Sequence, residues 1–287
     1  MRLHQCLNAA SEKLQKAGVD SPRLCAAVLV QMALERAPAT AAHLFCLMQK
    51  NRELTERECR VVDFLVRRRA EGRPLAQITG RREFYGRDFL VSRHTLIPRP
   101  ETELLVDTAL RLLPAHHILF ADMGAGCGCI GLTLAAERPL WRGVLADVTP
   151  QAVEVTLRNA RRLGLEKRVA SIQSDMFFSP LLPDSLDLFV SNPPYIAPEE
   201  RGEVMREVLD FEPPQALFSP DGGLAHLAAA IGAASRALRT GGIVLLEHGA
   251  SQGLAVRQLV HDTKNFSGIT TLQDLAGKER CTLAHKI

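Results

Sequence analysis

The 287-residue sequence is poor in aromatic residues: it has 1 Trp and 2 Tyr, and aromatic residues make up 5% of the chain. Few rings are therefore available to stack on nucleic-acid bases, so we expect no aromatic-rich surface that reads them. No apolar run approaches the roughly 20 residues needed to span a membrane. The nine His form no His-x-x-x-His pair and the seven Cys form no Cys-x-x-Cys pair, so no metal site is expected.

The remaining composition is that of an ordinary globular protein, with 46% hydrophobic and 23% charged residues. An odd number of scattered Cys argues against a disulfide framework and favours a reducing compartment. The first residues also lack the apolar stretch of a signal peptide. We therefore expect a cytoplasmic protein with no membrane association.

Charge is distributed unevenly along the chain. Residues 1–82 carry 15 Lys/Arg and 8 Asp/Glu, a net charge of +7, whereas the remainder has 20 against 24. A basic first part suggests an acidic partner or RNA, although an Arg-rich solvated helical surface explains the charge equally well. The same region reads as helical: Thr55 and Glu58 fit a capping box ahead of apolar residues at helical spacing.

The residue pattern of the sequence changes after this helical region. A Gly turn at Gly86 separates two short strand-like segments, and from residue 117 apolar strand segments alternate with helical ones. Such alternation predicts an α/β fold with a doubly wound, mostly parallel sheet. We predict a helical domain over 1–82, a β-hairpin linker over 83–99 and a Rossmann-like domain over 100–287, with further edge strands near 268–272 and 280–285.

Polar or glycine-rich segments follow four of the predicted strands, at the end where α/β sheets bind ligands. A glycine-rich turn spans residues 124–128, and Asp147 follows about 20 residues later at the end of the next strand. The turn suits close approach of a ligand at a helix N-terminus, and the carboxylate can accept both hydroxyls of a ribose. At a third strand end, Asp175 is placed to accept from an adenine amino group, and Met176 or Phe177 to pack on its ring. A solvated loop acid beside core hydrophobes is an equally good interpretation of this segment.

The fourth strand end carries Asn192-Pro193-Pro194-Tyr195. Two prolines make a stiff turn with free carbonyls, so the Asn192 oxygen and the Pro193 carbonyl can accept both hydrogens of an –NH₂ group. The Tyr195 ring would cover its flat face. His248, beside Glu247 at a later strand end, is predicted to be a packed histidine and not a base.

These motifs resemble class I S-adenosylmethionine-dependent methyltransferases, and in particular the HemK/PrmC-type release-factor glutamine methyltransferases. Further markers of the resemblance are Ile97-Pro98-Arg99-Pro100-Glu101-Thr102-Glu103, Phe211-Glu212-Pro213, Leu246-Glu247-His248-Gly249 and Glu279-Arg280. It extends from about Leu24 to Leu283. The chain departs from the family pattern at Ala125 and Cys127, where hydroxyl residues are common, and at Met176, where an aromatic residue is frequent.

The resemblance implies methylation of the side-chain amide nitrogen of the glutamine in the Gly-Gly-Gln motif of peptide chain release factors, with S-adenosylmethionine as cofactor. Nucleic acid would be met only indirectly, through the translation machinery. The implied cofactor-binding residues are Gly124, Ala125, Gly126, Cys127, Gly128, Asp147, Asp175, Met176 and Asn192. The implied substrate-binding residues are Asn192, Pro193, Pro194 and Tyr195, of which Asn192, Pro193 and Tyr195 are expected to be catalytic.

Two other functions fit parts of the sequence. The same tetrapeptide occurs in adenine-N6 methyltransferases of nucleic acids, which must flip a base out of its stack. A cofactor-binding partner protein without transferase activity would also need the glycine turn and Asp147, but the intact Asn192 tetrapeptide argues against it.

Overall fold

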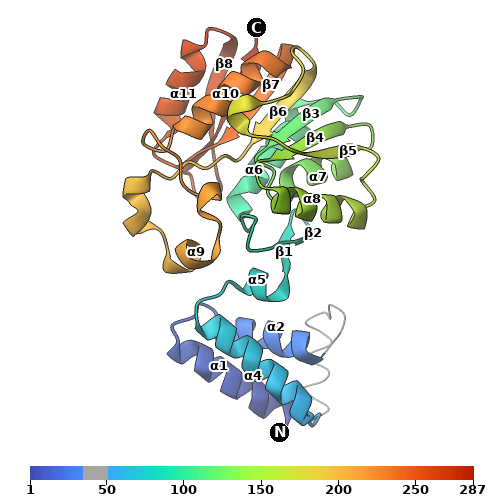
Figure 1. The fold of residues 1–287 in the computed structure, drawn as a ribbon, viewed down its shortest axis with the longest axis vertical. Coiled ribbons are helices and arrows are strands. Elements are labelled where there is room, and N and C mark those ends of the chain that lie inside the picture. The colour runs from blue at the N-terminus through green and yellow to red at the C-terminus, as the bar shows by residue number, and fades with distance from the viewer. Residues whose placement is uncertain (35–50) are drawn as a thin grey trace. The chain divides into compact units, whose positions relative to one another are not determined.

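A computed structural model describes residues 1–34 and 51–287. Residues 35–50, part of the predicted helical region, lie outside the described residues. The chain divides into two compact units (Figure 1). Unit 1 consists of Met1–Gly80 with Arg206–Phe211, and unit 2 consists of Arg81–Met205 with Glu212–Ile287.

Unit 1 is helical in its described residues. Its helices are α1 (Leu3–Lys16), α2 (Pro22–Leu34), α4 (Glu56–Ala70), α5 (Leu75–Thr79) and α9 (Arg206–Phe211). The predicted capping box is confirmed: the Glu58 amide donates to Thr55 Oγ1 over 3.2 Å, and the Thr55 amide donates to Glu58 Oε2 over 2.8 Å. Leucine, valine, alanine and cysteine side chains of α1, α2 and α4 form one buried apolar cluster. Burial of this shared face holds the helices together.

Helix α9 joins unit 1 although it lies more than 120 residues further along the chain. Glu207 forms an ion pair with the nearly buried Arg69 at 2.8 Å. The Gln77 side-chain amide donates to the Phe211 carbonyl over 2.6 Å, and the Arg73 guanidinium lies over the Phe211 ring. These contacts combine charge, hydrogen bonding and cation–π attraction on one short helix.

Unit 2 is built on a seven-stranded sheet of order β5-β4-β3-β6-β7-β9-β8. The strands are β3 (Leu119–Met123), β4 (Arg142–Asp147), β5 (Val169–Gln173), β6 (Leu186–Ser191), β7 (Leu238–Glu247), β8 (Phe266–Gln273) and β9 (Glu279–Lys286). The first five are parallel to one another, and β9 runs antiparallel to both β7 and β8. The predicted doubly wound, mostly parallel α/β fold is therefore confirmed.

The last two strands differ from the prediction in one respect. Both were expected at the edge of the sheet, but β9 inserts between β7 and β8, so that only β8 is an edge strand. Strand β9 is largely buried, with Cys281, Thr282, Leu283 and Ala284 shielded from solvent. A short turn from β8 lets β9 pair back along β8 while filling the position beside β7.

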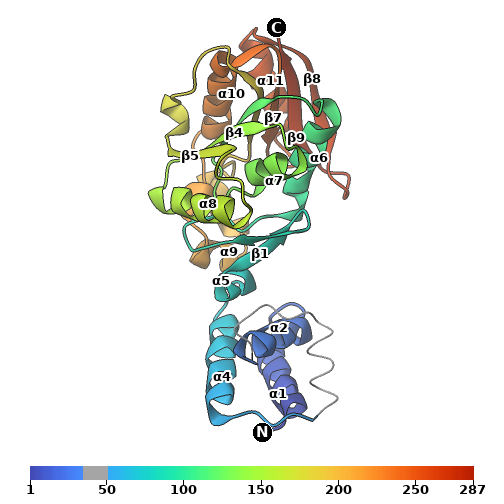
Figure 2. The ribbon, with the colours of Figure 1, turned by 90° about the vertical axis from the view of Figure 1, so that its right-hand side faces the viewer.

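Helices flank the sheet. They are α6 (Glu103–Leu112), α7 (Cys129–Glu137), α8 (Pro150–Arg162), α10 (Ala225–Ala237) and α11 (Gly253–Asp262). Helix α7 packs on β3 and β4, and α8 on β4 and β5, whereas α10 and α11 pack together near β6 to β9 (Figure 2). Strand β3 pairs with β4 on one side and with β6 on the other, so the chain reverses its winding direction there.

The predicted hairpin consists of β1 (Arg81–Phe84) and β2 (Arg87–Leu90) joined by Tyr85 and Gly86. Both turn residues have positive φ, as a two-residue hairpin turn of the primed type requires. The strain at Tyr85 is offset by hydrogen bonds from its amide to Glu103 and from its hydroxyl to Asp107 at 2.7 Å. The hydroxyl bond raises the pKa of Tyr85 to about 12.

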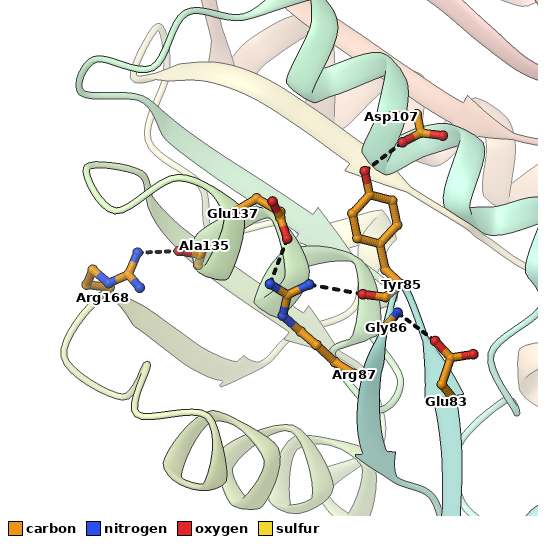
Figure 3. Close-up of polar contacts among 8 residues, drawn as sticks. All are labelled: Glu83, Tyr85, Gly86, Arg87, Asp107, Ala135, Glu137 and Arg168. Carbon is orange, nitrogen blue, oxygen red and sulfur yellow. Dashed lines mark hydrogen bonds and ion pairs between the residues drawn. The ribbon is translucent and has the colours of Figure 1, made fainter.

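A second set of contacts joins the hairpin to α7 (Figure 3). The Arg87 guanidinium pairs with Glu137 at 2.6 Å and donates to the Tyr85 carbonyl. Arg168 donates to the Ala135 carbonyl at the last turn of α7. Its positive charge also interacts favourably with the negative end of the helix dipole there. The hairpin is thus bonded to the sheet domain and belongs to unit 2.

Candidate active site

The strand register brings the predicted site residues to one level of the sheet. Met123 of β3 pairs with Ala146 of β4 and with Ser191 of β6. The next residues along these strands are Gly124, Asp147 and Asn192, so three segments separated by up to 68 residues become neighbours. This is the switch point of the sheet, where open α/β folds bind ligands.

A cavity of about 310 Å³ opens at this point, within unit 2. Most of the predicted site residues line it: Gly124, Ala125, Gly126, Cys127, Asp147, Asp175, Met176, Asn192 and Pro194. Gly128, Pro193 and Tyr195 are absent from its lining. The size suits a small-molecule ligand.

The glycine turn and Asp147 form one side of the cavity. Gly124 has a φ of 76°, which an L side chain rarely adopts, so the turn needs glycine there. The Gly126 amide donates to Asp147 Oδ2 and the Thr149 amide donates to Asp147 Oδ1, each over 2.9 Å. Burial raises the pKa of Asp147, and the two amide bonds counteract that effect. The carboxylate is thereby fixed with its free lone pairs available to a ligand.

Gly128 serves the fold and not the cavity wall. It precedes α7 with a φ of 82°. A Cβ at this position would lie 2.9 Å from side-chain atoms of both Leu132 and Thr156. Glycine is therefore required at this position by the packing of Leu132 and Thr156, and not by contact with the cavity.

Asp175 and Met176 follow β5 at the far end of the cavity. Asp175 caps the short helix Met176–Phe178, because its Oδ1 accepts from the Phe177 amide over 2.9 Å. Asp175 is exposed, whereas Met176 is buried with its methyl group toward Gly124. An acid and an apolar surface thus lie side by side at this end.

The tetrapeptide after β6 divides between the cavity and the core. Asn192 and Pro194 line the cavity, whereas Pro193 is buried behind it. The Asn192 side-chain amide donates to Thr102 Oγ1 over 3.2 Å. Tyr195 packs its ring against the apolar core and directs its hydroxyl to Glu247 Oε1 at 3.4 Å. The structure therefore does not place this ring over the cavity.

Two marker segments of the sequence form the opposite wall, a role that their residue types alone did not indicate. Pro98, Arg99 and Thr102 line the cavity together with Pro213 and Gln215. The buried Glu212 joins the segments: its Oε2 accepts from the Ile97 amide over 3.0 Å, and its Oε1 pairs with Arg99 at 2.5 Å. In the sequence, both segments were recognised only as markers of the family resemblance.

Sequence reasoning also missed His226, which lines the cavity beside Phe177. Its Nδ1 lies 2.8 Å from Ser219 Oγ, and burial lowers the pKa of the ring. His248 is packed as predicted: it is fully buried, with Nδ1 on the Gly249 carbonyl and Nε2 on Thr282 Oγ1, each at 2.9 Å. With both ring nitrogens engaged, His248 is not available as a base.

Neither a metal centre nor a membrane span was found in residues 1–34 and 51–287. No three His, Cys, Asp or Glu side chains in these ranges are grouped to hold a metal ion. No helix there is long and apolar enough to cross a membrane.

The sheet order, the glycine turn and Asp147 at the switch point, and an Asn-Pro-Pro-Tyr segment at the next strand end together define a Rossmann-like methyltransferase. A crystal structure of a methyltransferase from Pyrococcus furiosus shares this fold, with a TM-score of 0.52 at 15% identity over 71% of this chain and 90% of that one.

Comparison with known proteins specifies the family. The family model described as the PrmC N-terminal domain matches residues 5–80, and the methyltransferase small domain matches residues 100–240. The chain is 41% identical to the release factor glutamine methyltransferase of Nitratidesulfovibrio vulgaris (strain Hildenborough), over 99% of this chain and 95% of that protein. It is 38% identical to the enzyme of the same name from Escherichia coli K12, over 99% and 98%. The chain belongs to the release factor glutamine methyltransferase family, and it is an enzyme.

Membership in this family favours one of the three functions that the sequence left open. Nearly full-length similarity includes the helical N-terminal region, so the resemblance is not confined to the sheet that nucleic-acid methyltransferases share. The alternative of a non-catalytic partner protein is set aside, because the relatives that match over nearly the whole chain are named as methyltransferases.

Proposed function

We propose that this enzyme methylates the side-chain amide nitrogen of the glutamine in the Gly-Gly-Gln motif of peptide chain release factors, using S-adenosylmethionine. One observation of the site carries the proposal. The Asn192 side chain lines the cavity and its nitrogen is bonded to Thr102, so its oxygen is the atom left to accept a hydrogen bond from a substrate. An acceptor at this point suits an –NH₂ group.

The cavity fits the proposed cofactor. The glycine turn around Gly124 and Gly126 leaves room for close approach, and the carboxylate of Asp147 suits the two ribose hydroxyls. Ala125 and Cys127 add small lining groups beside the methionine part of the cofactor, and Met176 with Asp175 offers an apolar surface and an acceptor to adenine. When bound, S-adenosylmethionine supplies an electrophilic methyl group on a sulfonium.

The residues after β6 would overcome the low reactivity of an amide nitrogen, whose lone pair is delocalised into its carbonyl. Asn192 Oδ1 would accept one N–H bond. The Pro193 carbonyl is proposed to accept the other, although Pro193 is not among the residues that line the cavity. Together the two acceptors would hold the nitrogen in place and support positive charge developing on it. Pro194 shapes the slot, and Tyr195 supports the turn from the core side. The methylated nitrogen becomes acidic and loses its proton after transfer, so no strong base is required before it.

The N-terminal unit is proposed to recognise the release factor. Its match to a family-specific domain over residues 5–80 and its net positive charge over 1–82 support this role. The hairpin over 83–99 would then link it to the methyltransferase domain, 100–287. The six described cysteines are free thiols, which suits an enzyme acting in the cytoplasm on the translation machinery.

The direct test is mass spectrometry of a release factor incubated with the purified enzyme and S-adenosylmethionine. We expect one added methyl group, located by fragmentation on the glutamine of the Gly-Gly-Gln loop. Duplex DNA and a release factor with that glutamine replaced by alanine serve as controls. Methyl transfer to DNA, or transfer to the factor at another residue only, would exclude the proposed substrate.

Removal of residues 1–80 tests the recognition role. We expect the truncated enzyme to bind cofactor with unchanged Kd, because every cavity residue lies in unit 2. The KM for the release factor should rise about tenfold or more, the equivalent of losing a few interface contacts. Calorimetry gives the cofactor Kd and also reports that unit 2 is folded; an unchanged KM in a folded truncation would refute the assignment.

A further inference from the structure

His226, near the start of α10, brings to the cavity a polar ring that the proposed function does not use. The ring lines the cavity and meets the Phe177 ring edge to face, with 5.1 Å between their centres. Asp175 also lines the cavity, and its Oδ1 accepts from the Phe177 amide. Its Oδ2 has no hydrogen-bond partner among the described residues. An acid and a histidine thus adjoin the same residue at one end of the cavity.

Ser219 holds the His226 ring in place. Its side chain is fully buried, and its amide donates to the Ile196 carbonyl over 2.9 Å, directly after the Asn192–Tyr195 tetrapeptide. Ser219 Oγ accepts from the His226 amide over 3.1 Å and lies 2.8 Å from Nδ1 of the ring. One buried hydroxyl therefore fixes both the backbone and the ring of His226.

These bonds decide which nitrogen of the ring carries the proton. Nδ1 is the only acceptor that the Ser219 hydroxyl contacts among the described residues. A buried hydroxyl proton without an acceptor is costly, so Ser219 donates to Nδ1 and the ring proton resides on Nε2. Burial lowers the pKa of His226, with the charge of Asp175 opposing the shift, so the ring is neutral at pH 7.5. Nε2 has no partner in residues 1–34 and 51–287, which leaves its N–H as a donor for a ligand in the cavity.

A donor beside an acceptor matches one edge of adenine. The adenine amino group donates, and the ring nitrogen on either side of it, N1 or N7, accepts. We propose, on the basis of the cofactor proposed above, that His226 is a further cofactor-binding residue whose Nε2–H donates to one of these two nitrogens while Asp175 Oδ2 accepts from the amino group. The pair would select adenine against a base with an oxo group in place of the amino group, because an oxo group has no proton to give to the carboxylate.

Substitutions at His226 provide the first test, by calorimetric titration with S-adenosylhomocysteine at pH 7.5. His226→Phe keeps a ring against Phe177 but removes both nitrogens, so the Kd should rise about five- to tenfold, the effect of losing one hydrogen bond. His226→Gln places an amide N–H near the position of Nε2 and should restore most of the affinity. The control is His261→Phe in α11, since His261 is exposed and absent from the cavity lining. A His226→Phe enzyme that binds as tightly as wild type would overturn the proposal.

Cofactor analogues test the contact itself. Two analogues of S-adenosylhomocysteine, with carbon in place of adenine N1 or N7, each lack one acceptor. Wild type should bind one of them about five- to tenfold more weakly than the parent compound, whereas His226→Phe should bind that analogue and the parent equally. The same weakening in both proteins, for both analogues, would refute the contact. Failure of wild type to bind S-adenosylhomocysteine would refute the proposed cofactor and this inference with it, whereas binding that His226→Phe leaves unchanged would refute this inference alone.

The proton position can be measured without a ligand. Long-range ¹H–¹⁵N spectra of the full chain at pH 7.5, with the His226 signals assigned by their loss in His226→Phe, should show the proton on Nε2. Ser219→Ala removes the donor to Nδ1 and should give a mixture of both tautomers. A wild-type ring with its proton on Nδ1 would contradict the proposed donor.

Discussion

Replacement of Asn192 by alanine should leave an enzyme that binds its cofactor normally but transfers the methyl group about 100- to 1,000-fold more slowly, the usual loss when one preorganised polar group is removed from a reacting centre. Asn192 lines the cavity between the cofactor side and the wall that carries Thr102. Alanine leaves the strand and the following prolines intact, so the loss should appear in kcat and not in the cofactor Kd.

The measurement is single-turnover transfer to a release factor, with the cofactor Kd from calorimetry. Asn265→Ala is the control, because Asn265 lies in the turn between α11 and β8, level with the opposite ends of the parallel strands. It should transfer at the wild-type rate. Normal turnover by Asn192→Ala would exclude the amide-holding role, whatever the control shows.

Replacement of Asp147 by alanine should abolish tight cofactor binding. Hydrogen bonds to a charged group contribute about 1.5–3 kcal/mol each, so the loss of the two proposed ribose contacts should weaken cofactor binding, raising the Kd about 100-fold or more. The Gly126 and Thr149 amides would also lose their acceptor, and the turn would lose its fixed geometry. Both effects act in the same direction.

Asp147→Asn separates the two effects, because its remaining oxygen can still accept one backbone amide and its fold should stay close to wild type. We expect an intermediate Kd for this variant. Calorimetric titration with S-adenosylmethionine near pH 7.5 measures all three proteins. A Kd for Asp147→Ala within threefold of wild type would show that the carboxylate supports the loop without touching the cofactor.

Much of the fold follows from local sequence. The alternation of apolar strand segments with helical ones predicted the parallel sheet, and the Thr55 capping box and the Gly86 turn were found where expected. These features depend on interactions between residues within a few positions of one another, so they can be predicted from the local sequence. The placement of β9 between β7 and β8 could not be read this way, because pairing partners are chosen by the whole sheet.

The candidate site likewise has a part that the sequence predicts and a part that only the structure reveals. By itself the sequence determined the order of strands and helices and predicted which strand ends carry the site, because glycine, Asp147 and Asn192 follow recognisable strands and the resemblance to a methyltransferase family rests on those residues. Only the tertiary structure decided which groups meet there. Register between strands brings the residues after β3 and β6 level with the end of β4, and packing turns Tyr195 toward the core. Thr102 reaches the same point from a segment 90 residues earlier, since a buried polar group must find its partner in space and not in sequence.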